Sequence, residues 1–103
     1  MKDLNTYITE KLKIKKSSYK YFPKTKEELK DIINQLIEER GNDGDFNDID
    51  TSNITDMSEL FRDMYEFNGD ISNWDVSNIS NINYTHEIFK NCSIEEKYKP
   101  KFS

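Results

Sequence analysis

The feature that most constrains the fold of this chain is an internal repeat with a period of 25 residues. Residues 44–57 align with residues 69–82, and six of the fourteen aligned pairs are identical. A period between about 20 and 50 residues is typical of stacked structural units, because one such unit cannot bury its own apolar face. The sequence therefore predicts two stacked units, at residues 44–68 and 69–93.

The spacing of apolar residues indicates what one unit contains. The apolar residues of the first unit are separated by 5, 3, 3 and 1 positions: Ile49, Ile54, Met57, Leu60 and Phe61. This irregular spacing suits a short extended segment, a turn and then one or two helical turns. Short polar side chains between the first two of these residues favour a tight turn, and Thr55 or Asp56 is expected to cap a helix over residues 57–63.

The clearest helical signal lies ahead of the repeat. Thr25 and Glu28 form a capping box, the apolar residues that follow recur on one helical face, and Gly41 supplies a stop. These signals predict a helix over residues 26–40. Because this helix is apolar on one side only, we expect it to cover a core that the repeat supplies.

Two weaker patterns precede that helix. Residues 3–12 have the apolar spacing of a short amphipathic helix. Residues 19–22 alternate polar and aromatic side chains, which favours a short strand. We expect residues 1–41 as a whole to cap one end of the stack.

Two segments of the repeat resemble a known family. Residues 67–79, FNGDISNWDVSNI, look like the consensus of the BspA-type leucine-rich repeats, also called mycoplasma lipoprotein-associated surface repeats, and residues 54–61, ITDMSELF, resemble the adjoining part. The resemblance covers residues 44–91. It implies a short solenoid of strand-turn-helix units and a role in binding proteins or surfaces, with no cofactor and no catalytic residues.

Together these observations predict an α+β fold, a short leucine-rich-repeat-like solenoid of strand-turn-helix units capped by N-terminal helices. The 103 residues are expected to form a single domain. Its parts are an N-terminal helical cap with a short strand at 1–41, units at 44–68 and 69–93, and a C-terminal tail at 94–103. The predicted structural core is Leu29, Ile32, Ile33, Leu36, Ile49, Ile54, Met57, Leu60, Phe61, Ile71, Trp74, Ile79, Ile82 and Phe89.

Charge is distributed unevenly along the chain. Residues 1–40 carry a net charge of +3, residues 41–82 carry −9 and residues 83–103 carry +1, which sum to −5. The acidic block is either a solvated repeat surface or a face that meets a basic partner or mimics nucleic acid in a basic cleft. The candidate partner-binding residues are the acidic side chains Asp43, Asp45, Asp48, Asp50, Asp56, Glu59, Asp63, Asp70 and Asp75.

Catalytic and metal-binding patterns are weak. His86 is the only histidine and Cys92 the only cysteine, so a zinc site lacks ligands and a His-Cys dyad has no identifiable orienting acid. Residues 42–48, NDGDFND, invite a calcium site, but the EF-hand pattern fails at its glycine and at its bidentate glutamate. Basic and aromatic residues between 11 and 24 suit nucleic acid, yet the acidic chain favours a solvated edge there. We expect no enzyme, no metal and no cofactor.

The leading hypothesis is a non-enzymatic protein-protein interaction module of leucine-rich-repeat type that binds a protein partner through the repeat face. The alternative is a small acidic inhibitor from a phage or mobile element, similar in style to anti-CRISPR proteins, that mimics nucleic acid and blocks a host nuclease complex. In that case the partner is a basic nucleic-acid-binding protein, and no direct contact with nucleic acid is expected.

Location and self-association follow from the same sequence. With no secretory signal and no apolar run near the roughly 20 residues of a membrane span, we expect a cytoplasmic protein without membrane contact. The exposed ends of a two-unit stack leave self-association as a further expectation.

Overall fold

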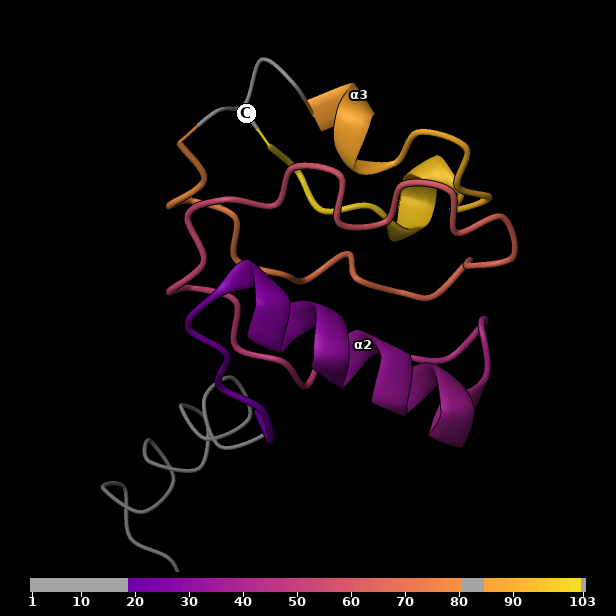
Figure 1. Ribbon diagram of the computed structural model, residues 1–103, viewed down its shortest axis with the longest axis horizontal. Helices are drawn as coiled ribbons and strands as arrows, with labels where there is room; N and C mark the ends of the chain where they lie inside the picture. The colour runs from indigo at the N-terminus through magenta and orange to yellow at the C-terminus, as the bar shows by residue number, and fades with distance from the viewer. Residues whose placement is uncertain (1–18, 81–84, 103) are drawn as a thin grey trace, which may run out of the picture.

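The computed structural model describes residues 19–80 and 85–102. Within these ranges the chain forms helix α2 (Lys26–Arg40), helix α3 (Thr85–Ile88) and the 3-10 helix η2 (Glu96–Tyr98), joined by turns and irregular backbone (Figure 1). None of the helices in these ranges is long and apolar enough to cross a membrane. The helix expected over residues 3–12 lies outside the described residues.

Helix α2 has the bounds that its sequence signals predict, so this prediction is confirmed. The Thr25 hydroxyl accepts a hydrogen bond from the Glu28 N–H at 3.1 Å. The Glu28 carboxylate accepts from the Lys24 N–H at 2.7 Å, one residue before the donor that a capping box uses. The helix ends at Gly41, whose φ of 82° lies in the left-handed region that favours glycine.

Beyond α2 the chain winds into coils that lie side by side in register. Backbone hydrogen bonds on both sides of Asp45 and Asp70 make these residues an isolated parallel bridge, and a second bridge joins Tyr21 to Ile49. Side chains reinforce the stack, as where Trp74 Nε1 donates to a backbone oxygen 28 residues earlier at 2.9 Å. The repeat thus appears in space as contacts between residues roughly one period apart.

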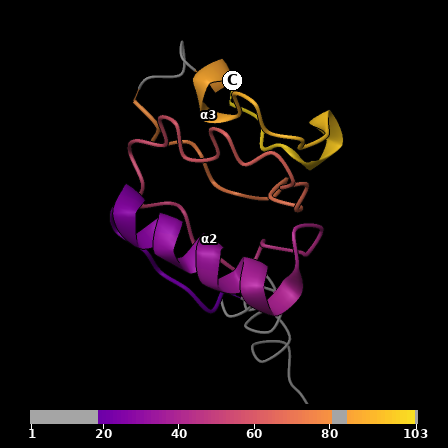
Figure 2. The ribbon, with the colours of Figure 1, turned by 45° about the vertical axis from the view of Figure 1, so that its right-hand side comes forward.

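One side of the stack is a column made by α2, the turns of residues 57–63 and α3, in that order (Figures 1 and 2). Lys30 Nζ donates to the Leu60 carbonyl at 2.6 Å, and the Phe61 N–H donates to the Ile88 carbonyl at 3.0 Å. Helix α2 therefore occupies in the first coil the place that residues 57–63 occupy in the second. Its apolar face covers the core that the repeat supplies.

The predicted fold class, an α+β solenoid of strand-turn-helix units, is wrong. Across residues 19–80 and 85–102 no strand forms, and parallel pairing is limited to the two isolated bridges. The strand expected at residues 19–22 is reduced to the bridge at Tyr21. The physical reason is that turns closed by aspartate side chains interrupt each coil within a few residues, so a ladder of backbone bonds cannot lengthen.

The helix expected over residues 57–63 is wrong as well. Glu59 and Asp63 have φ angles of 59° and 63°, which a right-handed helix excludes. The segment instead makes successive turns, and the Asp63 N–H donates to the Lys90 carbonyl at 2.8 Å. Short turn bonds, such as the one from the Leu60 N–H to the Met57 carbonyl, alternate with bonds to the neighbouring coil, in place of the continuous bonding within a helix.

Aromatic rings fill the core between the coils. Phe61 stacks on Phe67 with 4.7 Å between ring centroids and on Phe89 at 5.6 Å, while Trp74 lies 5.7 Å from Phe61. Gly69 is buried against Phe46 and Phe67. A Cβ atom at this position would lie 2.7 Å from ring atoms of both phenylalanines. A larger side chain at that position would overpack the core.

Most residues expected in the core are buried. The eleven buried ones are Leu29, Ile33, Leu36, Ile49, Ile54, Met57, Leu60, Phe61, Ile71, Trp74 and Ile79. Ile32 and Phe89 are half-buried and pack against this cluster, and Ile82 lies outside the described residues. Sequence reasoning did not include several buried residues, namely Phe46, Thr51, Phe67, Val76, Ile88 and Ile94.

The segment expected as a C-terminal tail packs along the second unit. The Ile71 N–H donates to the Tyr98 carbonyl at 3.0 Å, and the Glu95 N–H donates to Asn68 Oδ1 at 2.9 Å. Phe102 meets Phe89 edge-on with 6.3 Å between ring centroids. Residues 94–102 therefore begin a further coil beside the second unit.

Candidate interaction surface

Four aspartates at equivalent positions of the two units close tight turns in the same way: Asp45, Asp50, Asp70 and Asp75. In each, Oδ1 accepts from the backbone N–H two residues ahead, at 2.9 Å for Asp45 and 3.0 Å for the others. In the last three, the serine at that position also donates its hydroxyl to the same oxygen at 2.6 Å. These turn bonds use Oδ1 and leave Oδ2 outside the turn. We call these four carboxylates the acidic rows.

The carboxylates form two rows because the units are in register. Asp45 and Asp70 face each other in the parallel bridge. Asp50 and Asp75 lie one coil apart, and the Thr51 hydroxyl donates to the Asp75 carbonyl at 2.9 Å. Paired backbones lie about 4.8 Å apart, so each row holds two like charges on adjacent coils.

The turn bonds lower the pKa of two of the row carboxylates, Asp70 and Asp75. The Ser77 hydroxyl and N–H hold the pKa of Asp75 below its usual value of 3.8, against an opposing effect of burial. For Asp70, burial acts most strongly and raises the pKa, but hydrogen bonds from the side chains of Ser72 and Asn47 and from the Ser72 backbone together leave it lowered. A carboxylate with a lowered pKa is charged at neutral pH and is suited to ion pairing.

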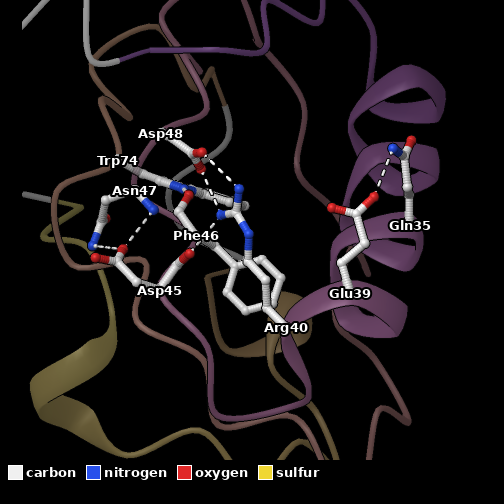
Figure 3. A network of polar contacts seen from close by, with 8 residues as sticks. All are labelled: Gln35, Glu39, Arg40, Asp45, Phe46, Asn47, Asp48 and Trp74. Carbon is white, nitrogen blue, oxygen red and sulfur yellow. Dashed lines mark hydrogen bonds and ion pairs between the residues drawn. The ribbon is translucent and has the colours of Figure 1, made fainter.

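Asp48 belongs to a different arrangement, at the end of α2 (Figure 3). The Arg40 guanidinium makes two bonds to the Asp48 carboxylate, at 2.8 and 2.9 Å, and donates to the Asp45 carbonyl at 2.8 Å. The bond from Arg40 lowers the pKa of Asp48. A paired Arg-carboxylate contact of this geometry ties the last turn of α2 to the first repeat unit.

The remaining predicted acidic residues stand apart from the rows. Three lie in the column that contains residues 57–63 and are engaged there. Asp56 closes a turn of the same kind, since its Oδ1 accepts from the Ser58 N–H at 2.8 Å, but its Oδ2 is 3.5 Å from Lys26 Nζ. Glu59 pairs with Arg62 at 2.8 Å, and Asp63 accepts from Asn91 at 2.8 Å. The ninth, Asp43, is exposed in the turn after α2. The structure therefore brings together four of the nine predicted residues.

Catalytic and metal hypotheses receive no added support in the described ranges. Cys92 is half-buried, its thiol lies 3.6 Å from the Phe67 carbonyl, and burial raises its pKa, which disfavours the reactive thiolate. In the segment that resembles a calcium loop, Asp45 Oδ1 is held by the N–H and side chain of Asn47. Residues 19–80 and 85–102 contain no group of three or more His, Cys, Asp or Glu side chains that could hold a metal ion.

Sequence reasoning missed a second charged feature. Lys97, Lys99 and Lys101 line one groove, about 1050 Å³ in volume, together with the turn at Ser72 and Asn73 of the second unit. We call these three lysines the basic stripe. The alternation of lysine with Tyr98 and Pro100 was the available signal. It was overlooked because residues 83–103 carry a net charge of only +1.

Comparison with known proteins gives one match. A family model described as "Mycoplasma protein of unknown function, DUF285" matches residues 27–97, which include α2 except for its first residue, α3 and both repeat units. The assignment to the BspA-type leucine-rich repeats is therefore wrong, because the matching family is a different one, although both descriptions refer to mycoplasma proteins. No curated protein and no solved structure matches the chain.

Proposed function

The chain belongs to the DUF285 family of mycoplasma proteins of unknown function, and from this premise we propose that it is a non-enzymatic module that binds a basic protein partner through the acidic rows. The observation that carries the proposal is the repeated turn in which an aspartate Oδ1 is bonded to the chain and Oδ2 lies outside the turn. We further propose that the module is cytoplasmic. Its single cysteine cannot form an intramolecular disulfide, and such bonds are common in secreted domains of this size but rare in the cytosol.

Fixed carboxylates favour binding because little side-chain freedom is lost when a partner docks. A free aspartate must give up rotamers to form an ion pair, whereas these four are already oriented by their turns. Guanidinium and ammonium groups bond to carboxylates about twice as strongly as neutral groups do. Among the described residues, none of the four takes part in an ion pair, so their charge is uncompensated locally.

The protonation state also suits recognition. The pKa values of Asp70 and Asp75 are lowered, so these carboxylates do not exchange protons near neutral pH as a general acid or base would. Complementary charge across an interface speeds association and selects the partner. We therefore expect a partner surface rich in lysine and arginine, and binding that weakens as salt is added.

Paired baits test this function. The wild-type chain is compared with a variant in which Asp45, Asp50, Asp70 and Asp75 are all changed to Asn. An asparagine Oδ1 can still accept the turn bonds, so the variant loses four charges but retains the turns. The control variant removes the same number of charges from exposed acids outside the rows: Glu27→Gln, Asp31→Asn, Glu38→Gln and Glu66→Gln.

We expect one or a few basic proteins to be retained by the wild type and by the control, and to be depleted at least about tenfold on the row variant. Recovery of the same proteins by all three baits would contradict the proposal. If the retained protein binds nucleic acid, an added oligonucleotide should displace it from the bait only where the chain occupies its nucleic-acid cleft. Displacement would therefore favour the inhibitor hypothesis, and retention would favour binding at another surface.

A further inference from the structure

The basic stripe runs beside the acidic rows. The Tyr98 carbonyl accepts from the Ile71 N–H at 3.0 Å, which places the segment of the stripe one coil beyond the segment that carries Asp70 and Asp75. The chain direction is the same in both segments, because Lys101 and Phe102, which follow Tyr98, lie near Trp74, three residues beyond Ile71. The stripe therefore runs alongside the segment of the second coil that carries Asp70 and Asp75, in the same direction.

Two hollows join the stripe to the second unit, and one of them brings Asp75 of the acidic rows beside Lys101. The larger is lined by the three lysines of the stripe and by the turn that lies between Asp70 and Asp75. The smaller is lined by Asp75 and Ser77 from the second unit and by Lys101 and Phe102 from the last coil. A surface that approaches this face meets negative charge on one half and positive charge on the other.

The two features do not neutralise each other within the described ranges. Lys99 pairs with Glu96 at 2.8 Å and lies over the Phe89 ring. Lys97 lies over the Tyr98 ring at 5.1 Å. None of the ion pairs joins the stripe to the rows. Each half of the face thus keeps unpaired charge that another surface can meet.

An acidic strip beside a parallel basic strip is complementary to itself. Rotation by half a turn about an axis that lies along the boundary between the strips sets each strip against its opposite. Most protein dimers use such an axis, with the same patch on both copies. The apolar floor of the groove, which includes Trp74, Phe89 and Phe102, would then be covered by the partner copy and add hydrophobic stabilisation.

We propose that the basic partner of the acidic rows is the basic stripe of a second copy of this chain, in a two-fold dimer held by reciprocal contacts between rows and stripe. This rests on the proposed function, because it uses the same rows. A long polyanion such as nucleic acid fits this face less well. Its phosphates would be attracted to the stripe but repelled by Asp75, which lines the adjoining hollow together with Lys101.

Charge exchange between copies tests the dimer. Variant A carries Lys97→Glu and Lys101→Glu. Variant B carries Asn53→Lys and Asn73→Lys, two exposed positions beside the rows whose side chains make no hydrogen bond in the described ranges. Variant B therefore counters the rows without disturbing the aspartate turns. Circular dichroism and thermal unfolding of each variant alone establish that it is folded.

The measurement is the dissociation constant from sedimentation equilibrium in low salt, with Trp74 fluorescence as a second signal because this single tryptophan lines the groove. We expect the wild type to dimerise and to dissociate as salt is raised, because exposed charges are screened within about 10 Å at 0.1 M. Variants A and B alone should associate at least about tenfold more weakly, and their equimolar mixture should recover the wild-type constant within about threefold.

Failure of this inference is distinguishable from failure of the proposed function. A wild-type chain that is monomeric at about millimolar concentration in low salt overturns the dimer, since a specific dimer should have a dissociation constant below that concentration. The proposed function still stands if the row variant described above loses a basic protein that the wild type retains. A dimer that survives in variant A and in the row variant uses other contacts, and overturns the inference too.

Discussion

Helix α2 and the turns of residues 57–63 occupy the same column of the stack, yet they are built differently. The backbone hydrogen bonds of helix α2 lie within the helix itself, from its Thr25 cap to Gly41. Residues 57–63 contain two residues with left-handed backbone and bond to the next coil at Ile88 and Lys90. The same column thus contains one element whose hydrogen bonds are local in sequence and another whose conformation depends on hydrogen bonds to the next coil.

The difference shows where the stability of each region comes from. A helix of 15 residues is marginal in water by itself, even with good caps. The apolar face of α2 therefore needs the coils, and the coils need the aromatic cluster around Phe61. We expect the two regions to unfold together, and the following predictions test that dependence.

The largest effect is expected from Phe61→Ala. Phe61 is fully buried and contacts three other aromatic rings, so its truncation should destabilise the protein by about 3–5 kcal/mol. The measurement is urea unfolding followed by Trp74 fluorescence and by circular dichroism at the helix band. The midpoints of both unfolding transitions should move together to a lower urea concentration.

The matched control is Phe22→Ala, because Phe22 is 57% exposed. Its effect should stay within about 0.5 kcal/mol. If Phe61→Ala abolished the tryptophan transition but left the helix signal unchanged, α2 would be independent of the coils and the comparison would break.

A smaller effect is expected from Thr25→Ala, which removes the hydroxyl that accepts from the Glu28 N–H at 3.1 Å. Loss of this cap should cost about 1 kcal/mol, and Thr25→Ser should recover most of it. Thr55→Ala is the control, since Thr55 is exposed and only its backbone carbonyl is bonded in the described ranges. Equal midpoints for Thr25→Ala and Thr55→Ala in the same urea experiment would show that the cap does not stabilise α2.

The smallest effect concerns pH and the contact that joins α2 to the repeat. The bond from Arg40 holds the pKa of Asp48 below its usual 3.8. The folded pKa is thus lower than the unfolded one, so this stabilisation is present above about pH 4 and is lost as pH falls through the lowered value. The free energy of unfolding should therefore be nearly flat from neutral pH to about pH 5 and fall below about pH 4.

Asp48→Asn should remove part of this acid dependence and cost less than about 1 kcal/mol at neutral pH, because the pair is partly exposed. Urea titrations of both proteins across this pH range provide the measurement. Identical pH profiles would assign the acid sensitivity to other carboxylates with lowered pKa values, such as Asp56, Asp70 and Asp75.

Sequence reasoning succeeded where the determining contacts are close along the chain. Thr25, the apolar stripe of α2 and Gly41 all act within a few residues, so the helix could be delimited before the structure was known. It failed over residues 57–63, although the apolar spacing there is also helical. The competing bonds come from residues 88 and 90, and no local pattern reports them.

The candidate surface divides in the same way. The composition predicts an acidic repeat surface, but it does not distinguish among the nine acidic residues on it. In the structure Asp45, Asp50, Asp70 and Asp75 share a turn geometry, while Asp48 is committed to Arg40. The basic stripe was missed because its importance depends on which coil it lies beside.

By itself, the sequence determined the helix from Lys26 to Arg40, the alignment of residue 44 with residue 69, and the presence of turn-forming aspartates at equal positions in both units. These follow from local backbone preferences and from similarity at a fixed period. Tertiary structure alone decided that 57–63 forms turns, that four carboxylates make two rows, and that three lysines lie on the next coil beside them. The reason is physical: these outcomes depend on bonds between coils 24 to 28 residues apart, whose partners become neighbours only after the coils have stacked.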